Sequence, residues 1–358
     1  MKVLLVRQTF VHLTSHSGYD ITFNNVDQHK YASVYYSYRL LKFQKAINKV
    51  LSILLPKYFG MHYRFEQFLL EVRIAWAIKK YKPKVVHITH VQDDLRIITK
   101  KSFSKGVTLI GTVHIPHVMW KTGRRKMEWL NMYDKIMVLD HYSKNAFEKH
   151  FPGKIIFAPH GVDTEYFKLT KSFSTHSKKE TFNCFFVGRF LRDLEMVFDI
   201  IKLLYQTDKT IHFHFSHPMI FAPQQFYYKM IGVMSLSTVH YYSKVNDATL
   251  LKFYQEHDLL VMPMFESTAN NVFLEAAACG MPVLSTPTNG LPSYMPPSLE
   301  DTLGNLNSAE DIVALILQFR NDPAYYNDVA KTLYDYTIEN FNLEKSKEVP
   351  FQLYEEYL

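Results

Sequence analysis

The chain has 358 residues, of which 47% are hydrophobic, and its formal net charge is +7 at pH 7. This length suits two domains rather than one ordinary core, and the two cysteines exclude a disulfide framework. No apolar run approaches the ~18 residues that span a bilayer, and the amino-terminal MKVLLV is too short for a signal peptide, so we expect a cytoplasmic protein, soluble or peripheral at the inner membrane face.

The first half of the chain alternates short apolar segments with helical ones. We expect strands at 2–7, 85–89, 108–114 and 135–139. Such alternation predicts a parallel α/β sheet.

Positive charge is concentrated in this half. Residues 1–170 hold 27 Lys and Arg against 12 Asp and Glu, and eleven of those cations lie between Arg39 and Lys84. Apolar residues recur there at helical spacing until Pro56, with Lys42, Lys45 and Lys49 between them: Leu40, Phe43, Ile47, Val50, Leu51 and Leu54. The pattern predicts a basic amphipathic helix, which either docks on an anionic membrane surface or packs on the sheet with a solvated basic face.

The second half repeats the α/β pattern. We expect strands at 182–187, 211–215, 238–242, 259–262 and 283–285, and helices at 312–319 and 323–341. The polar loop Thr170–Glu180 separates the halves and predicts a hinge. We therefore expect two facing, doubly wound, Rossmann-like domains at 1–170 and 181–342, with an interdomain cleft at their strand ends, where α/β folds bind ligands.

The segment 258–294 predicts a strand, loop, helix and strand. The helix is expected at 269–279, with Thr268 as its cap and Gly280 and Pro282 ending it. Free backbone N–H groups and the helix dipole at such a start favour a diphosphate. Glu266 and Glu275 flank this position, where carboxylates would accept hydrogen bonds from sugar hydroxyls.

This segment resembles the retaining glycosyltransferases of family four, which have the GT-B fold. The family carries two glutamates with seven residues between them, followed by a helix of small residues that ends in Ala-Cys-Gly-x-Pro-Val. Here eight residues separate Glu266 from Glu275, so the strict count back from Glu275 reaches Ser267. The resemblance implies that Glu275 binds the nucleotide ribose and that Glu266 lies near the donor sugar. Thr268, Ala269, Asn270 and Asn271 resemble one subgroup of the family, and we expect Ser267, Thr268, Asn270 and Asn271 to line the donor site.

Two further segments carry the resemblance. Val187, Gly188 and Arg189 end a predicted strand, and Arg192 follows; two guanidinium groups there would clamp a diphosphate. The family usually has a lysine where this chain has Leu194, and Arg192 is its natural substitute. Pro159–Asp163, followed by Phe167, is similar to the turn that ends the first domain in the family, and the last helix, 343–358, is expected to return to that domain.

The first half offers a candidate at a strand end. His114 follows the strand at 108–114, and the family has a histidine at the corresponding position near the donor sugar. We name His114, with Arg189 and Glu266, as catalytic candidates. Residues that the resemblance suggests for the acceptor side are His16, Gly18, Tyr19 and His117.

Three histidines raise the question of a metal site, but the residues around them do not support one. His212 and His214 would share one strand face, with His217 close behind. No carboxylate or cysteine accompanies them at ligand spacing, so we interpret them as structural. We expect no metal and no cofactor.

The expected function is transfer of a sugar from a nucleoside diphosphate donor to an acceptor hydroxyl, with retention of configuration and without metal. The acceptor would be a glycan or a lipid-linked glycan of a bacterial surface, close to an anionic membrane. The same fold serves sugar-nucleotide epimerases and phosphorylases, and a protein that only binds nucleotide sugars is a further alternative. The cations form no recognisable nucleic-acid-reading motif, so no nucleic-acid partner is expected.

Overall fold

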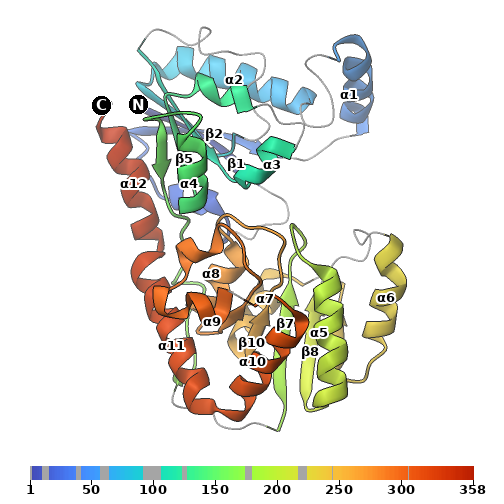
Figure 1. Cartoon of the computed structure of the whole chain (residues 1–358). Helices are drawn as coiled ribbons and strands as arrows, with labels where there is room; N and C mark the ends of the chain where they lie inside the picture. The colour runs from blue at the N-terminus through green and yellow to red at the C-terminus, as the bar shows by residue number, and fades with distance from the viewer. Residues whose placement is uncertain are drawn as a thin grey trace. The chain divides into compact units, whose positions relative to one another are not determined.

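The computed structural model describes residues 2–9, 16–37, 42–56, 64–91, 106–122, 127–173, 180–216, 224–243, 245–304 and 306–358. It divides into two compact units, Met1–Gly161 with Leu343–Leu358, and Val162–Asn342 (Figure 1). The division falls earlier in the chain than the loop that we interpreted as a hinge, Thr170–Glu180, of which positions 174–179 lie outside the described residues.

Unit 1 contains a six-stranded parallel sheet in the order β2-β1-β3-β4-β5-β6. Its strands are β1 (Val3–Thr9), β2 (Tyr31–Ser37), β3 (Val85–Ile88), β4 (Thr108–Val113), β5 (Lys135–Val138) and β6 (Ile155–Phe157). The strand order reverses between β1 and β3, so the switch point of this sheet, where α/β folds commonly bind ligands, lies at the carboxyl ends of these two strands. The predicted parallel sheet is confirmed, and β2 and β6 are additions to it.

Helices surround this sheet. They are η1 (Tyr19–Phe23), α1 (Lys42–Leu54), α2 (Phe65–Tyr81), α3 (His117–Thr122), η3 (Met127–Met132), α4 (His141–Glu148) and α12 (Leu343–Glu355). α2 contacts β1 and β2 and buries Leu70, Ile74 and Ala77. α12 packs against η1, and the hydroxyl of Tyr354 on α12 hydrogen-bonds His87 in β3. The last helix is therefore part of unit 1.

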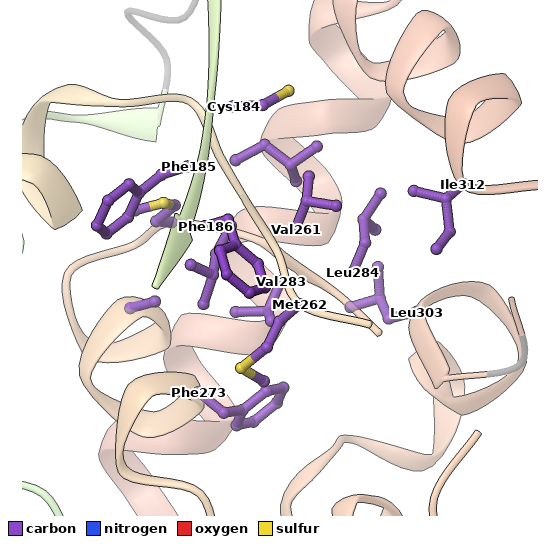
Figure 2. Packing of buried hydrophobic residues seen from close by; sticks show 14 of the residues in the cluster. Cys184, Phe185, Phe186, Val261, Met262, Phe273, Val283, Leu284, Leu303 and Ile312 are labelled. Carbon is purple, nitrogen blue, oxygen red and sulfur yellow. The ribbon is translucent and has the colours of Figure 1, made fainter. Parts of the chain in front are cut away.

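Unit 2 contains a five-stranded parallel sheet in the order β11-β10-β7-β8-β9. Its strands are β7 (Phe182–Val187), β8 (Ile211–Ser216), β9 (Val239–Tyr242), β10 (Leu259–Val261) and β11 (Val283–Leu284). β8 and β9 follow β7 on one side, and β10 and β11 then lie on its other side, so the switch point of the sheet lies between β7 and β10. Figure 2 shows part of the core of this unit, where Phe186, Val261 and Phe273 lie among other buried apolar side chains.

The helices of unit 2 form two groups. They are α5 (Leu194–Thr207), α6 (Gln224–Met234), α7 (Asp247–Glu256), α8 (Asn271–Ala278), η6 (Leu291–Tyr294), η7 (Pro297–Leu299), α9 (Glu300–Gly304), α10 (Ala309–Asn321) and α11 (Pro323–Asn340). α5 contacts α6 and α10, whereas α8 contacts α7 and α11, as expected for the two helix layers of a doubly wound sheet. The expectation that Thr268 caps α8 is wrong, because the side chain of Asn270 accepts the hydrogen bond from Phe273 N at 3.3 Å.

The predicted basic helix is confirmed as α1. None of the described helices is both long and apolar enough to cross a bilayer. Cys184 and Cys279 are buried free thiols.

Candidate functional site

In unit 2, the loops that follow β7 and β10 meet at the switch point. Arg192 forms an isolated antiparallel bridge with Met264. Two backbone hydrogen bonds flank the bridge, from Asp193 N to Pro263 O at 3.0 Å and from Phe265 N to Leu191 O at 2.9 Å. Paired backbone of this kind fixes both loops relative to the strands that precede them.

The Arg192 guanidinium lies inside this junction. Arg192 is 8% exposed, its Nε donates to the Val187 carbonyl at 3.3 Å, and its Nη1 lies 2.8 Å from Met264 Sδ. Burial lowers the pKa of Arg192 to about 10, which leaves the side chain cationic at neutral pH. Among the ion pairs of the described residues, none includes Arg192. A buried cation that contacts only a carbonyl and a thioether is costly, and an anionic ligand would offset that cost.

Gly188 makes room for this guanidinium. Its φ is 105°, a conformation that other residues rarely adopt, and a Cβ here would lie 2.9 Å from Arg192 Nη2. Leu191 is also held at a positive φ, 57°, which is uncommon for a bulky residue and marks a tightly determined loop. Arg189, the second predicted phosphate ligand, is exposed beside them.

Helix α8 starts directly after the β10 loop. Asn270 caps it, and Asn271 is its first residue, so the predicted amide side chains stand at a helix amino terminus. Ser267 and Thr268 are buried in the preceding loop, where Ser267 Oγ donates to the Thr268 carbonyl at 2.8 Å. The backbone dipole of such a start favours negative charge.

Glu275 lies one turn further along α8. It is 3% exposed, and its Oε2 accepts a hydrogen bond from the hydroxyl of Tyr254 on α7 at 3.0 Å. Tyr254 is fully buried and was not predicted as a site residue. The tyrosine orients the carboxylate, so Glu275 is a fixed acceptor for hydrogen bonds.

Glu266 binds the loop that follows β11. Its carboxylate accepts hydrogen bonds from Ser267 N at 2.9 Å, from Asn289 N at 2.8 Å and from the Asn289 side-chain amide. Next to Asn289, Gly290 approaches so closely that a Cβ would lie 2.3 Å from Ser267 O. Glu266 therefore joins two loops at the carboxyl edge of the sheet, and its predicted sugar contact stays a prediction.

In unit 1, a histidine pair lies beside the switch point. The rings of His90, which follows β3, and His114, which follows β4, stack with centroids 4.0 Å apart and an interplanar angle of 8°. His114 Nε2 lies 2.7 Å from the Thr89 carbonyl and must donate to it. Burial lowers the pKa of His114 to about 3, so the ring is neutral at physiological pH. His90 was not among the predicted site residues, because the resemblance that singled out His114 was not carried to the end of the neighbouring strand.

The predicted acceptor-side residues separate into two groups. The ring of Tyr19 lies edge-on to His114, with centroids 4.9 Å apart; Gly18 immediately precedes Tyr19, and His16 lies three positions before it. Tyr19 is 2% exposed, and its hydroxyl lies 3.4 Å from Thr112 Oγ1. The ring of His117 instead packs edge-on against Phe147, with centroids 4.8 Å apart, and stacks on His150 at 5.8 Å. The acceptor roles remain predictions.

The other predicted histidines make structural contacts. His212 Nδ1 lies 3.1 Å from His240 Nε2, and His214 contacts Tyr242 Oη and Asn183 Oδ1, both at 3.2 Å. His217 lies outside the described residues. Over the part of the chain that the structure covers, no group of three or more His, Cys, Asp or Glu is arranged to hold a metal ion.

A comparison with protein families finds a match within the second unit. Residues 181–322, which contain the whole of the site described for unit 2, match the family model Glycosyl transferases group 1. This segment is therefore similar to the glycosyl transferases group 1 domain.

Solved structures match the chain over nearly its full length. Anabaena HepE in complex with UDP-glucose has a TM-score of 0.69 at 12% identity, covering 99% of this chain and 100% of that chain. A glycosyltransferase from Rickettsia africae gives 0.66 at 14% identity (99% and 98% covered), and sucrose-phosphate synthase from Thermosynechococcus elongatus gives 0.64 at 16% identity (99% and 88% covered). At such identities the likeness shows the fold, which is GT-B. No curated protein matches the sequence.

Proposed function

We propose that this protein is a retaining glycosyltransferase, which moves a sugar from a nucleoside diphosphate donor to an acceptor hydroxyl. The observation that carries the proposal is the buried Arg192 cation at the switch point of the unit that matches the glycosyl transferases group 1 model. HepE, a structural neighbour, was solved with UDP-glucose and with UDP, and an anion of this class suits a buried cation near a helix start.

The chemistry follows from where charge develops. As the anomeric bond breaks, negative charge accumulates on the departing diphosphate. Arg192, Arg189 and the amino terminus of α8 neutralise it, and one guanidinium at about 4 Å contributes on the order of 4 kcal/mol at an effective dielectric near 20, before desolvation is subtracted. We propose that this arrangement replaces a divalent metal, and chelation by EDTA tests that statement.

The remaining residues orient the reactants. Glu275, held by Tyr254, accepts hydrogen bonds from the ribose hydroxyls, and Glu266 and His114 position the transferred sugar. The neutral ring of His114, held by the Thr89 carbonyl, is able to hydrogen-bond an uncharged sugar hydroxyl. We assign no protein base, because the leaving diphosphate is itself able to take the acceptor proton.

The acceptor is proposed to be a glycan or a lipid-linked glycan in the synthesis of a bacterial surface polymer, with the protein cytoplasmic and peripheral to the membrane. Unit 1 supports this with its excess of cations.

An assay of nucleotide release, with and without candidate acceptors, tests the activity. A transferase releases nucleoside diphosphate far faster when an acceptor is present. Release that needs inorganic phosphate would indicate a phosphorylase, isomerised sugar nucleotide without release would indicate an epimerase, and binding with no reaction would indicate a binding protein. The anomeric coupling of the first product, measured by NMR, reports retention.

A further inference from the structure

Helices α1 and α2 present apolar side chains to solvent. On α2, Leu69, Val72 and Trp76 are 40%, 46% and 61% exposed. On α1, Ile53 and Leu54 are each 69% exposed. Side chains of this size rarely stay in water as a group without a partner.

The apolar residues of α2 lie on one stripe of the helix. Leu69, Val72 and Trp76 are three and four positions apart, which places them on one face. The opposite face, with Leu70, Ile74 and Ala77, is buried against the sheet. α2 is thus apolar on two sides, and one of them packs against the sheet whereas the other is exposed.

The two helices are fixed to each other by Asn48 of α1. Its Oδ1 accepts a hydrogen bond from Phe65 N, at the start of α2, at 2.7 Å. Its Nδ2 donates to the Glu66 carboxylate at 3.2 Å. These contacts hold α1 against the amino terminus of α2, so the exposed side chains of both helices lie on connected elements of unit 1.

The charge on this surface has a single sign. Residues 42–81 contain only two acids, Glu66 and Glu71, and both are buried, at 6% and 0% exposure. The exposed charged side chains of the two helices are therefore all cations: Lys45, Lys49, Arg73, Lys79 and Lys80. Lys80 Nζ lies 4.8 Å from the centre of the Trp76 ring, so a cation and an aromatic ring share one site.

We propose that the exposed faces of α1 and α2 dock on an anionic lipid bilayer. Exposed aliphatic and indole side chains suit the boundary between headgroups and acyl chains, where tryptophan is enriched. Lysine and arginine extend from the same faces towards lipid phosphates. A protein partner for this surface would need a matching acidic apolar patch, whereas a bilayer of anionic lipid offers both components everywhere. The proposal deepens the proposed function by locating where a lipid-linked acceptor would be met.

Sedimentation with vesicles tests the proposal, with pure phosphatidylcholine compared with three parts phosphatidylcholine to one part phosphatidylglycerol. We expect binding to the anionic vesicles, weak binding to the neutral ones, and a loss of about fivefold in partitioning for each cation removed by Lys49→Gln and Arg73→Gln. The double variant Leu69→Ser, Trp76→Ser should lose at least about tenfold. The tryptophan emission of the wild type should shift to the blue when the protein binds vesicles. Trp76→Phe should retain binding but lose this shift.

Matched controls lie in unit 2. Lys252→Gln and Lys331→Gln remove the same charge from exposed helical positions, and Tyr228→Ser removes an aromatic side chain that is 79% exposed. These variants should bind vesicles like the wild type. Equal losses in the two sets, equal binding to neutral and anionic vesicles, or no binding at all would overturn the proposal. Concentration-dependent self-association that Trp76→Ser abolishes, without vesicle binding, would identify the surface as a protein interface instead.

Vesicle binding is measured without any nucleotide sugar, so its failure is distinguishable from failure of the proposed transferase activity. Nucleotide affinity measured on the same variants should equal that of the wild type, because the substituted residues lie outside the described site.

Discussion

The hydroxyl of Tyr254 donates a hydrogen bond to Glu275 Oε2 at 3.0 Å, and both side chains are buried. The pair joins α7 to α8 and fixes the carboxylate that we assign to the nucleotide ribose. A hydrogen bond to a charged group contributes more to stability than one between neutral groups.

Tyr254→Phe removes only this hydrogen bond. We expect a loss of about 2 kcal/mol in the free energy of unfolding, and an increase of about tenfold in the Kd for the nucleoside diphosphate, because the carboxylate is no longer oriented. Urea unfolding and calorimetry measure the two effects. Tyr326→Phe is the control, since Tyr326 is also buried and donates to the Asp258 carbonyl at 2.7 Å. The control should lose stability and keep its nucleotide affinity; an equal change in Kd would contradict the assigned role.

Gly290→Ala tests the contact between the loops that follow β10 and β11. The added Cβ would lie 2.3 Å from Ser267 O and 2.6 Å from Thr268 Cα, so the backbone must shift. We expect a loss of about 2 kcal/mol or more in the free energy of unfolding. Gly232→Ala is the control, because Gly232 lies within α6 and, apart from the local backbone of the helix, no atom lies within 4 Å of the added Cβ. Alanine at position 232 should raise the free energy of unfolding by about 1 kcal/mol. Similar losses of stability for the two variants would show that the loop contact at Gly290 is not tight.

Arg7→Ala tests the ion pair that holds η1 against β1. Arg7 Nη2 lies 2.7 Å from Asp20 Oδ2, at 5% and 15% side-chain exposure, and its Nη1 also donates to the Phe23 carbonyl at 2.9 Å. Removing the cation leaves these acceptors buried, so we expect a loss of about 3–5 kcal/mol. Glu355→Gln, which breaks the more exposed pair with Lys30, should cost under about 1 kcal/mol. Equal urea midpoints for the two variants would contradict this difference.

His87 makes the stability of the protein depend on pH. The ring is buried between Tyr354 and Thr112, and burial lowers its pKa to about 3. The unfolded chain binds a proton near pH 6.5, where the folded protein does not, so acidification favours unfolding. Between these two pKa values the His87 contribution to the free energy of unfolding should fall by about 1.4 kcal/mol per pH unit as pH decreases.

His87→Gln disturbs the hydrogen bonds to Tyr354 and Thr112, so the variant should be less stable than the wild type at pH 7. Because the variant also lacks the titrating ring, it should lose less stability than the wild type between pH 6 and pH 5. Urea unfolding at these pH values measures the slope. An unchanged slope in the variant would show that His87 does not remain neutral in the folded protein.

Much of the fold was predictable from the sequence, for local reasons. The strand at 182–187 and the run at 259–262 are apolar and end at Gly188 and Pro263, and the structure contains β7 and β10 there. β2 was missed because Tyr31–Ser37 mixes tyrosine and serine without an apolar run, and β6 because it has only three residues. Asn270 rather than Thr268 caps α8, a choice between two good caps that depends on the loop geometry.

The site was less predictable, because it depends on contacts between distant segments. Arg192 was named from its position after a strand, but its burial follows from the bridge to Met264. Tyr254 lies 21 positions before Glu275, and no local pattern connects them. His90 and His114 are likewise brought together by the pairing of β3 with β4.

The central claim is that the buried Arg192 cation binds the diphosphate of the donor. Calorimetric titration of wild type and Arg192→Gln with UDP, GDP and ADP tests it most directly, with Arg320→Gln as a control for loss of a mostly buried arginine in the same unit, where Arg320 pairs with Asp208. We predict that one nucleotide binds the wild type in the presence of EDTA, that Arg192→Gln weakens its binding by about a hundredfold, and that Arg320→Gln leaves its binding unchanged. Equal affinity in wild type and Arg192→Gln, or binding that EDTA abolishes and a divalent ion restores, would contradict the account.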